Sequence, residues 1–519
     1  MQTKIFKRSS FLPVLSLAMV FTALLTGCKK EEPTYPLPVL SIDGNAEAEL
    51  KPGATVSVVL TVNGGGGAKA IRVKRGGGFL EEVPVDENAV SFTYNTQKVP
   101  DDLGEGEELS YGFSLVNKNN VESPEVSFLV TGALYDKITV GSEALFDVAI
   151  PTDGIVNSGS AIKLVKGRKY HISKSLTFAP GAKLEVEEGV MVYVKADREN
   201  PIEIEIQGEA AILGTASAPV VFTSSRALTP NTPAAPGDWT WFRLSGSGNT
   251  SNSGKINYLR LEYAGERAFR LTEVGEATEI DYVQVYKASG EGVMITNGNA
   301  RLKHIVATDC EGGSFRLGNQ YSGYMQFLIS VNSAYYAEND DFSIREEASP
   351  VISNLTVLGA GQDISNTHGM RIRATAAPKI YNAIIAEFPR RGVRGTDDIS
   401  ITDMSGAAVF AHSYVFAVNT DPYRDLAVAF AGTFDAVTGE RLTNPFNNNV
   451  TKRLGSTFEV ASIPGIGVGD FVPDAETPGE FNPSSVHAFF SAAAYAGAVN
   501  GSNGDWTKGW VKNPDGSIR

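Results

Sequence analysis

Arginines at regular intervals are the residues of this chain best placed to do chemistry. In each of six short runs between residues 269 and 394, one residue lies between two apolar positions. These residues are Arg270, Met294, Arg316, Ser343, Arg371 and Arg394, and a parallel set two positions further on is Thr272, Thr296, Arg345 and Arg373. If the runs stack as neighbouring strands ~4.8 Å apart, both sets form columns on one outer face. Guanidinium groups bind carboxylates and sulfates in pairs of hydrogen bonds. The pattern therefore predicts a binding face for a long acidic ligand, with Arg270, Arg316, Arg345, Arg371, Arg373 and Arg394 as its ligand-binding residues.

Acidic residues near the columns allow a purely structural alternative. Stacked arginines repel each other unless anions neutralise them. The acids close to them in sequence are Glu266, Glu273, Glu291, Glu311, Asp340, Asp341 and Glu346. Solvated ion pairs of this kind are common and contribute little energy.

A hydrolase is a further alternative. Asp340-Asp341, His368-Gly369 and the pair Arg371 and Arg373 resemble the order of motifs in polygalacturonases, which combine paired aspartates, a Gly-His-Gly and a basic dipeptide. Thr367 stands where that pattern has its first glycine. Asp340 and Asp341 are adjacent in one predicted strand, so they face opposite ways and at most one lies on any surface. The two carboxylates that hydrolysis requires are therefore not both available from this pair.

A lyase or a metal site has even less support. The predicted outer face offers arginines but no stacked acids for Ca²⁺. The histidines are scattered without metal-ligand spacing, and each is expected to be an ordinary surface or loop residue: His171, His304, His368, His412 and His487. Cys310 is expected to be a buried thiol. Trp239 and Trp241 are expected to face the same way, an arrangement that suits stacking on a sugar, although packing against the solenoid is the commoner fate of such a pair. We expect no cofactor and no metal.

The elements that carry these residues are a repeated pair of strands. The first strand reads apolar-x-x-apolar-x-apolar, starting at Ile256, Ile280, Leu302, Met325, Ile352 and Ile380, about 22–28 residues apart. The second strand begins near Phe269, Val293, Phe315, Phe342, Met370 and Val393. Two strands per unit without a helix between them predict a parallel β-helix, whose coils bury their apolar faces by stacking. The handedness of parallel crossovers predicts a right-handed one. A β-sandwich with regular hairpins is the alternative.

Composition supports an all-β protein and limits its partners. The 519 residues include 53 glycines and carry a formal net charge of −14. That charge argues against a nucleic-acid partner held by bulk electrostatics. The two cysteines, Cys28 and Cys310, provide no disulfide framework.

The N-terminus predicts export and lipid anchoring. Lys4, Lys7 and Arg8 precede an apolar run that ends in Leu25-Thr26-Gly27-Cys28, which resembles the lipobox of bacterial lipoproteins. That resemblance implies a lipid-modified, palmitate-bearing Cys28 and an outer-membrane protein. The following Lys29-Lys30-Glu31-Glu32 resembles the Bacteroidetes signal for export to the cell surface, which implies that the protein faces the exterior.

The domain order follows from changes in pattern along the chain. Residues 1–27 are the predicted signal peptide and 28–38 a proline-containing tether. Short alternating strands between glycine-rich turns over 39–132 predict a small immunoglobulin-like β-sandwich. The parallel β-helix is assigned to 133–425. The register fades over 426–519, which predicts a loop-rich C-terminal cap over the open end of the solenoid.

Several segments resemble one bacterial family. These are Leu176–Val186, Glu203–Gln207, Pro219–Thr223, Pro236–Trp239, Ile256–Gly265, Ile280–Val285 and a closing segment from Ala488 through Tyr495–Ala498 to Trp510. They are similar to Bacteroidetes surface and secreted proteins with right-handed parallel β-helix repeats, mostly without an assigned activity. The preferred interpretation is a non-catalytic surface lipoprotein that binds glycan or another extracellular partner. A polysaccharide lyase or glycoside hydrolase acting on acidic polysaccharide, and a structural or adhesive spacer, are the alternatives.

Overall fold

A computed structural model describes most of the chain. The described residues are 36–334, 340–345, 347–362, 367–373, 375–395, 408–418 and 462–519, with five short strands between residues 423 and 459. Cys28, the predicted signal peptide and Glu346 lie outside them. Backbone contacts divide the chain into two compact units, a small N-terminal one and a larger one that holds Val130–Arg519 together with Ala48–Thr55 and Gln97–Leu109.

The N-terminal unit is the predicted β-sandwich. One sheet has the order β1-β3-β6 and the other β2-β8-β7-β4-β5. The strands are β1 (Val39–Asp43), β2 (Glu47–Leu50), β3 (Ser57–Asn63), β4 (Ala68–Arg75), β5 (Gly78–Pro84), β6 (Ser91–Asn95), β7 (Glu108–Asn117) and β8 (Val126–Gly132). Alternate residues such as Leu60, Ile71 and Phe113 are buried between the sheets, as period-two strands require.

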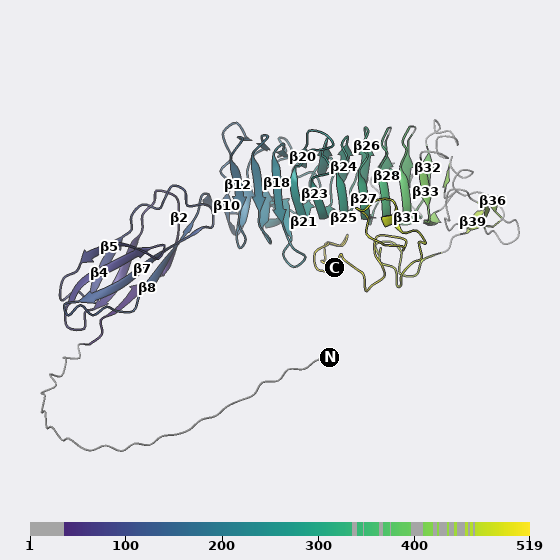
Figure 1. The fold of residues 1–519 in the computed structure, drawn as a ribbon. Helices are drawn as coiled ribbons and strands as arrows, with labels where there is room; N and C mark the ends of the chain where they lie inside the picture. The colour runs from purple at the N-terminus through teal and green to yellow at the C-terminus, as the bar shows by residue number, and fades with distance from the viewer. Residues whose placement is uncertain are drawn as a thin grey trace, which may run out of the picture. The chain divides into compact units, whose positions relative to one another are not determined.

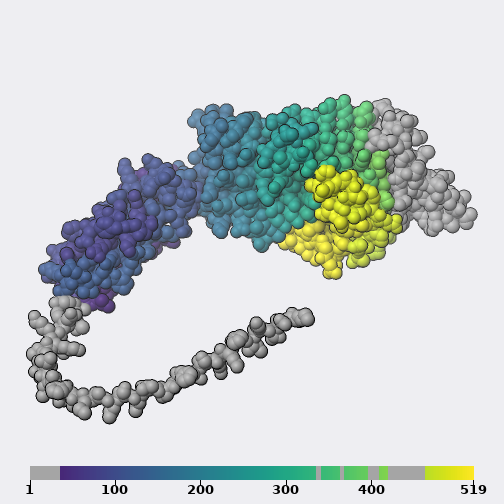
Figure 2. Space-filling model, viewed as in Figure 1, coloured from purple at the N-terminus to yellow at the C-terminus, as the bar shows by residue number. Residues whose placement is uncertain are grey.

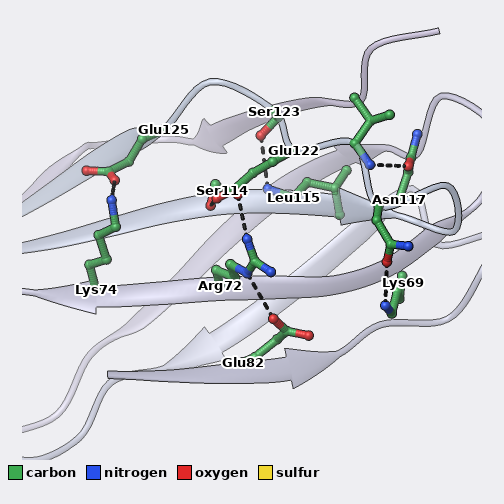
Figure 3. A network of polar contacts seen from close by, with 12 residues as sticks. Lys69, Arg72, Lys74, Glu82, Ser114, Leu115, Asn117, Glu122, Ser123 and Glu125 are labelled. Atoms are coloured by element: carbon green, nitrogen blue, oxygen red, sulfur yellow. Dashed lines mark hydrogen bonds and ion pairs between the residues drawn. The ribbon is translucent and has the colours of Figure 1, made fainter. Parts of the chain in front are cut away.

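Charged side chains cover one outer surface of the sandwich (Figure 3). Arg72 on β4 donates hydrogen bonds to Glu82 at 2.9 Å and to Glu122 at 2.6 Å, and Lys74 pairs with Glu125 at 2.8 Å. These side chains are about 40% exposed. Exposed pairs of this kind contribute little stability, so this network indicates a solvated surface and not a site.

The larger unit is the predicted parallel β-helix (Figure 1). Its strands pair in parallel from β10 to β35, whereas the later pairs β36–β37 and β38–β39 are antiparallel. The strands of the early coils are β9 (Asp136–Val140), β10 (Glu143–Asp147), β11 (Ile155–Val156), β12 (Ala161–Leu164), β13 (Lys169–Ile172), β14 (Leu176–Phe178), β15 (Lys183–Val186), β16 (Met191–Val194), β17 (Ile204–Ile206), β18 (Glu209–Leu213), β19 (Val220–Ser224) and β20 (Phe242–Ser245). Two short 3₁₀ helices, Ser225–Leu228 and Pro483–Ser485, occur among the described residues, and no described helix has the length and apolarity needed to span a membrane.

The later coils have one long and one short strand each, as the repeat predicted. The long strands are β21 (Gly254–Glu262), β23 (Glu279–Tyr286), β25 (Arg301–Thr308), β27 (Tyr324–Val331), β29 (Val351–Leu358) and β31 (Lys379–Phe388). The short strands are β22 (Phe269–Thr272), β24 (Val293–Thr296), β26 (Phe315–Gly318), β28 (Asp340–Ile344), β30 (His368–Ile372) and β32 (Arg391–Gly395). Next come β33 (Val409–Ala411), β34 (Tyr414–Val418), β35 (Tyr423–Arg424), β36 (Thr433–Phe434), β37 (Arg441–Thr443), β38 (Lys452–Leu454) and β39 (Thr457–Glu459).

The predicted register is confirmed along the core. Ile256 lies opposite Ile280, and the central apolar residues of successive coils stack in one column: Leu259, Val283, Ile305, Leu328, Leu355 and Ala383. Every one of these central residues is fully buried. Stacking of coils therefore provides the continuous core that one coil could not form alone.

A bend divides each long strand and explains the apolar-x-x-apolar spacing. β21 pairs with both β18 and β19, so it is two strands joined at Tyr258, whose φ is 49°. The equivalent residues of the next coils also have positive φ: Tyr282, His304, Phe327, Asn354 and Asn382. The aromatic side chains among them stack, with 4.2 Å between the ring centroids of Tyr258 and Tyr282 and again between Tyr282 and His304.

The prediction that the histidines are ordinary surface or loop residues is wrong for three of them. His304 belongs to this aromatic stack, and His171 and His368 are buried.

Residues 462–519, here called the C-terminal strap, lie along the flank of the solenoid (Figures 1 and 2). Side-chain amides of the coils bind its backbone. Gln284 donates to the Lys512 carbonyl and accepts from the Lys512 N–H, both at 2.8 Å, and Gln326 forms the same two contacts with Ser491. Asn354 donates to the carbonyl of Tyr495 at 2.7 Å. The predicted cap spanned residues 426–519, and its part before residue 462 lies outside the described residues apart from four short strands. The described part lies on the flank and not over the open end, because the flank carries the amide groups that satisfy its backbone.

A buried ion pair secures the start of the solenoid. Glu105 is fully buried, and its carboxylate accepts hydrogen bonds from Arg168, from the Tyr170 hydroxyl at 3.0 Å and from the Leu134 N–H at 2.7 Å. Arg168 also pairs with Glu49 at 2.9 Å. Burying a carboxylate is costly unless it is paired with a positive charge and hydrogen-bonded, and Glu105 has both kinds of partner.

We expect Glu105→Ala to lower the free energy of unfolding by about 3–5 kcal/mol, since it leaves the buried Arg168 without its closest partner. Glu143→Ala is the matched control, because Glu143 pairs with Lys169 at 2.6 Å on an exposed surface of the same coils. Its loss should cost less than about 1 kcal/mol. Denaturant unfolding of both variants is the measurement, and equal costs would contradict a structural role for Glu105.

Candidate functional site

The short strands of the later coils place the predicted arginines in one row. Arg270 on β22 lies opposite Met294, Met294 opposite Arg316, and the row continues through Ser343, Arg371 and Arg394. The residues on either side of each one, such as Phe315 and Leu317 around Arg316, are buried in the core. This alternation turns the row outward.

Five of the six predicted arginines line one cavity. Its volume is about 230 Å³, and its lining residues are Glu291, Gly312, Phe315, Arg316, Asp340, Ser343, Arg345, Arg371, Arg373 and Arg394. We call it the arginine pocket. Arg270 lies outside it, because Met294 separates Arg270 from Arg316.

Two carboxylates stand among these arginines. Glu291 pairs with Arg316 at 2.5 Å. Asp340 pairs with two guanidinium groups, those of Arg394 at 2.8 Å and Arg371 at 3.4 Å. The expected neutralisation by acids is therefore confirmed for these three arginines, and two of their guanidinium groups share the single carboxylate of Asp340.

Asp340 and Asp341 face opposite ways, as predicted. Asp341 is inside the solenoid, where its carboxylate accepts hydrogen bonds from Asn332 at 2.9 Å, from the Ser314 N–H at 3.1 Å and from the Ser330 hydroxyl. Burial raises the pKa of Asp341 despite these donors. Its carboxylate does not reach the arginine pocket, so it supplies no second acid there.

His368 lies opposite Asp340 on the adjacent strand and is buried. Burial and the positive charge of Arg394 lower the pKa of His368 to about 4, although Asp340 opposes the shift. The imidazole is therefore neutral at pH 7. Among the described residues, no group of three or more His, Cys, Asp or Glu side chains is arranged to hold a metal ion.

The row of arginines extends one residue further than the sequence predicted. Arg243 on β20 lies opposite Arg270, one coil closer to the N-terminus. Trp241 lies beside them, with its ring centroid 5.5 Å from the Arg270 guanidinium carbon. The signal that could have found Arg243 is the short run Phe242-Arg243-Leu244, which repeats Phe269-Arg270-Leu271.

The prediction that Trp239 and Trp241 face the same way is wrong. Trp239 is fully buried and donates its indole N–H to the Glu262 carbonyl at 2.9 Å. Trp239 forms an isolated bridge with Ala264, whereas β20 begins only at Phe242. Neither tryptophan belongs to β20, so the strand alternation on which the prediction rested does not apply to them.

Comparison with known proteins agrees with this architecture. The family model described as a pectate-lyase-like beta helix domain matches residues 154–250 and 234–458. The chain belongs to that family. Family membership establishes the β-helix and leaves open whether the chain binds a polysaccharide or cleaves one.

A solved structure of pectate lyase Pel3 from Pectobacterium carotovorum is similar to the chain at 11% sequence identity, covering 70% of this chain and 92% of the lyase. Its TM-score is 0.12, which gives no support for a shared activity. None of the curated proteins matches the chain.

Proposed function

We propose that this protein is a non-catalytic binder of acidic glycan and that the arginine pocket is its binding site. The observation that carries the proposal is the sharing of Asp340 by Arg371 and Arg394 in a cavity lined by three further arginines. A uronic-acid or sulfated sugar supplies the planar or tetrahedral anion that guanidinium forks bind. The small volume of the pocket suits one sugar unit, with longer chains extending along the row of arginines.

Calorimetric titration with galacturonic acid oligomers of increasing length tests this proposal. Affinity should rise with length and fall with added salt, because the contacts are exposed enough to be screened over ~10 Å at 0.1 M. We expect Arg371→Gln to weaken binding about tenfold, the size of one charge-assisted hydrogen bond. Arg301→Gln is the matched control, since Arg301 is similarly exposed but pairs with Glu276 away from the pocket.

Absence of binding at low salt for every oligomer would overturn the proposal and favour the structural or adhesive spacer. Equal losses for Arg371→Gln and Arg301→Gln would show that binding follows net charge and not the pocket.

A polysaccharide lyase is the second candidate, favoured by His368. Its lowered pKa keeps a neutral imidazole, the form that can accept a proton, in register with Asp340 of the pocket. Neighbouring arginines would stabilise the negative charge that develops when a proton next to a sugar carboxylate is removed. Incubation with polygalacturonate distinguishes the two candidates, because a lyase generates unsaturated products with new ultraviolet absorbance and a binder generates none.

We also propose that the protein is an outer-membrane lipoprotein facing the cell exterior, anchored through Cys28. Support comes from the basic residues, apolar run and Leu25-Thr26-Gly27-Cys28 order at the N-terminus, and from their resemblance to Bacteroidetes surface lipoproteins. A glycan-binding solenoid held at the surface would meet its ligand before the ligand crosses the membrane.

A further inference from the structure

The residues around Trp241 form a second group of arginines in the same row, two coils from Arg316 toward the N-terminus. We call Trp241, Arg243, Arg270 and Thr272 the Trp241 cluster. Arg243 pairs with Glu205 at 3.6 Å, and nearby Arg267 reaches Glu291 at 4.0 Å. Arg270 has no carboxylate partner among the described residues and instead lies over the ring of Trp241.

The surroundings of Arg270 favour an added anion. Burial, together with the positive charges of Arg243 and Arg267, lowers the pKa of Arg270, although Glu205 and Glu203 oppose the shift. Three guanidinium groups therefore crowd a partly buried region. An anion bound beside Arg270 would relieve this repulsion and form charge-assisted hydrogen bonds.

Unsatisfied polar atoms gather at the same place. In the described part of the chain, four buried polar atoms of this cluster have no hydrogen-bond partner: Trp241 Nε1, Arg243 Nε, Arg270 Nε and Thr272 Oγ1. Leaving a buried donor or acceptor unpaired is costly, so such groups in native proteins call for an explanation. A ligand with both hydroxyl groups and a negatively charged group would provide the missing hydrogen-bond partners after small shifts of these side chains.

We propose that the Trp241 cluster is a second subsite for the acidic glycan, in which Arg270 binds a carboxylate or sulfate and the adjacent aromatic and hydroxyl groups contact the sugar ring. The proposal rests on the function assigned to the arginine pocket. Arg270 and Arg316 are two coils apart with Met294 between them, which corresponds to ~10 Å along the solenoid. A single sugar cannot reach both, whereas an oligosaccharide can.

Length dependence separates the two subsites. The probes are galacturonic acid as monosaccharide, disaccharide and hexasaccharide, titrated calorimetrically into wild type, Arg270→Gln, Arg371→Gln and the control Arg301→Gln. Arg270→Gln should weaken hexasaccharide binding about tenfold and leave monosaccharide binding unchanged. Arg371→Gln should weaken both, because it alters the pocket itself.

Tryptophan emission provides an independent readout. The chain has four tryptophans, and the hexasaccharide should change the emission of wild type but not of Trp241→Phe. If Arg270→Gln binds every probe like wild type, or if the emission change persists in Trp241→Phe, the second subsite is overturned while the arginine pocket stands. If no probe binds wild type, the proposed function and the second subsite both fail.

Discussion

Replacing Leu355 by aspartate should unfold the solenoid under conditions in which wild type is fully folded. Leu355 is completely buried and stacks between Leu328 and Ala383 of the neighbouring coils. An aspartate there would bury a charge with no partner, and we expect a loss of more than about 4 kcal/mol in the free energy of unfolding. Thermal and denaturant unfolding monitored by circular dichroism is the measurement.

Two further variants make this result interpretable. Leu355→Ala removes the packing without adding a charge and should cost about 2–5 kcal/mol. Leu213→Asp makes the same exchange at a leucine that is 47% exposed in the same solenoid and should stay within about 0.5 kcal/mol. A melting temperature of Leu355→Asp equal to that of Leu213→Asp would contradict the register described above.

Replacing Cys28 by alanine should release the protein from the membrane fraction. If Cys28 carries the lipid, each acyl chain contributes ~0.8 kcal/mol per buried methylene, and stable anchoring requires more than one chain. The variant has no thiol to modify, so it should move almost entirely to the soluble fraction. Detergent partition and cell fractionation of wild type and Cys28→Ala are the measurement.

Cys310→Ala is the matched control for this experiment, because Cys310 is a buried free thiol of the solenoid and cannot carry an anchor. It should stay with the membrane as wild type does. Retention of Cys28→Ala in the membrane fraction would mean that another part of the chain holds the protein there.

The repeat was predictable because each coil contributes its own local pattern to the sequence. Apolar residues that recur once per repeat, such as Ile256 and Ile280, predicted the core. The same repeat length predicted that Arg316 and Arg371 lie in one outer row. The extent of the pocket was less predictable, since it depends on which carboxylates approach the row. Asp340 lies 31 residues before its partner Arg371 and 54 before Arg394, so no local pattern links them.

Two features had no clear sequence signal. The positive φ of Tyr258 and Tyr282 is unusual for bulky residues, and it is the parallel pairing on both sides of the bend that imposes it. The strap was missed because side chains such as Gln284 and Asn354 bind backbone groups of a segment far along the chain. In the sequence, a polar residue that recurs in the repeat looks the same whether its side chain faces solvent or binds the backbone of another segment. Only the folded structure distinguishes these two roles.

The strap has a consequence for the order in which this protein folds. Gln284 meets Lys512 across 228 residues of sequence, whereas neighbouring coils meet across one repeat. Local contacts form first and distant ones last, because closing a long loop costs more entropy and is slower. The coils can therefore stack as the chain lengthens, but their flank is completed only when residues 462–519 are available. Without residues 462–519, the side-chain amides of Gln284, Gln326 and Asn354 would lose these backbone partners, so the coils alone are not the finished fold.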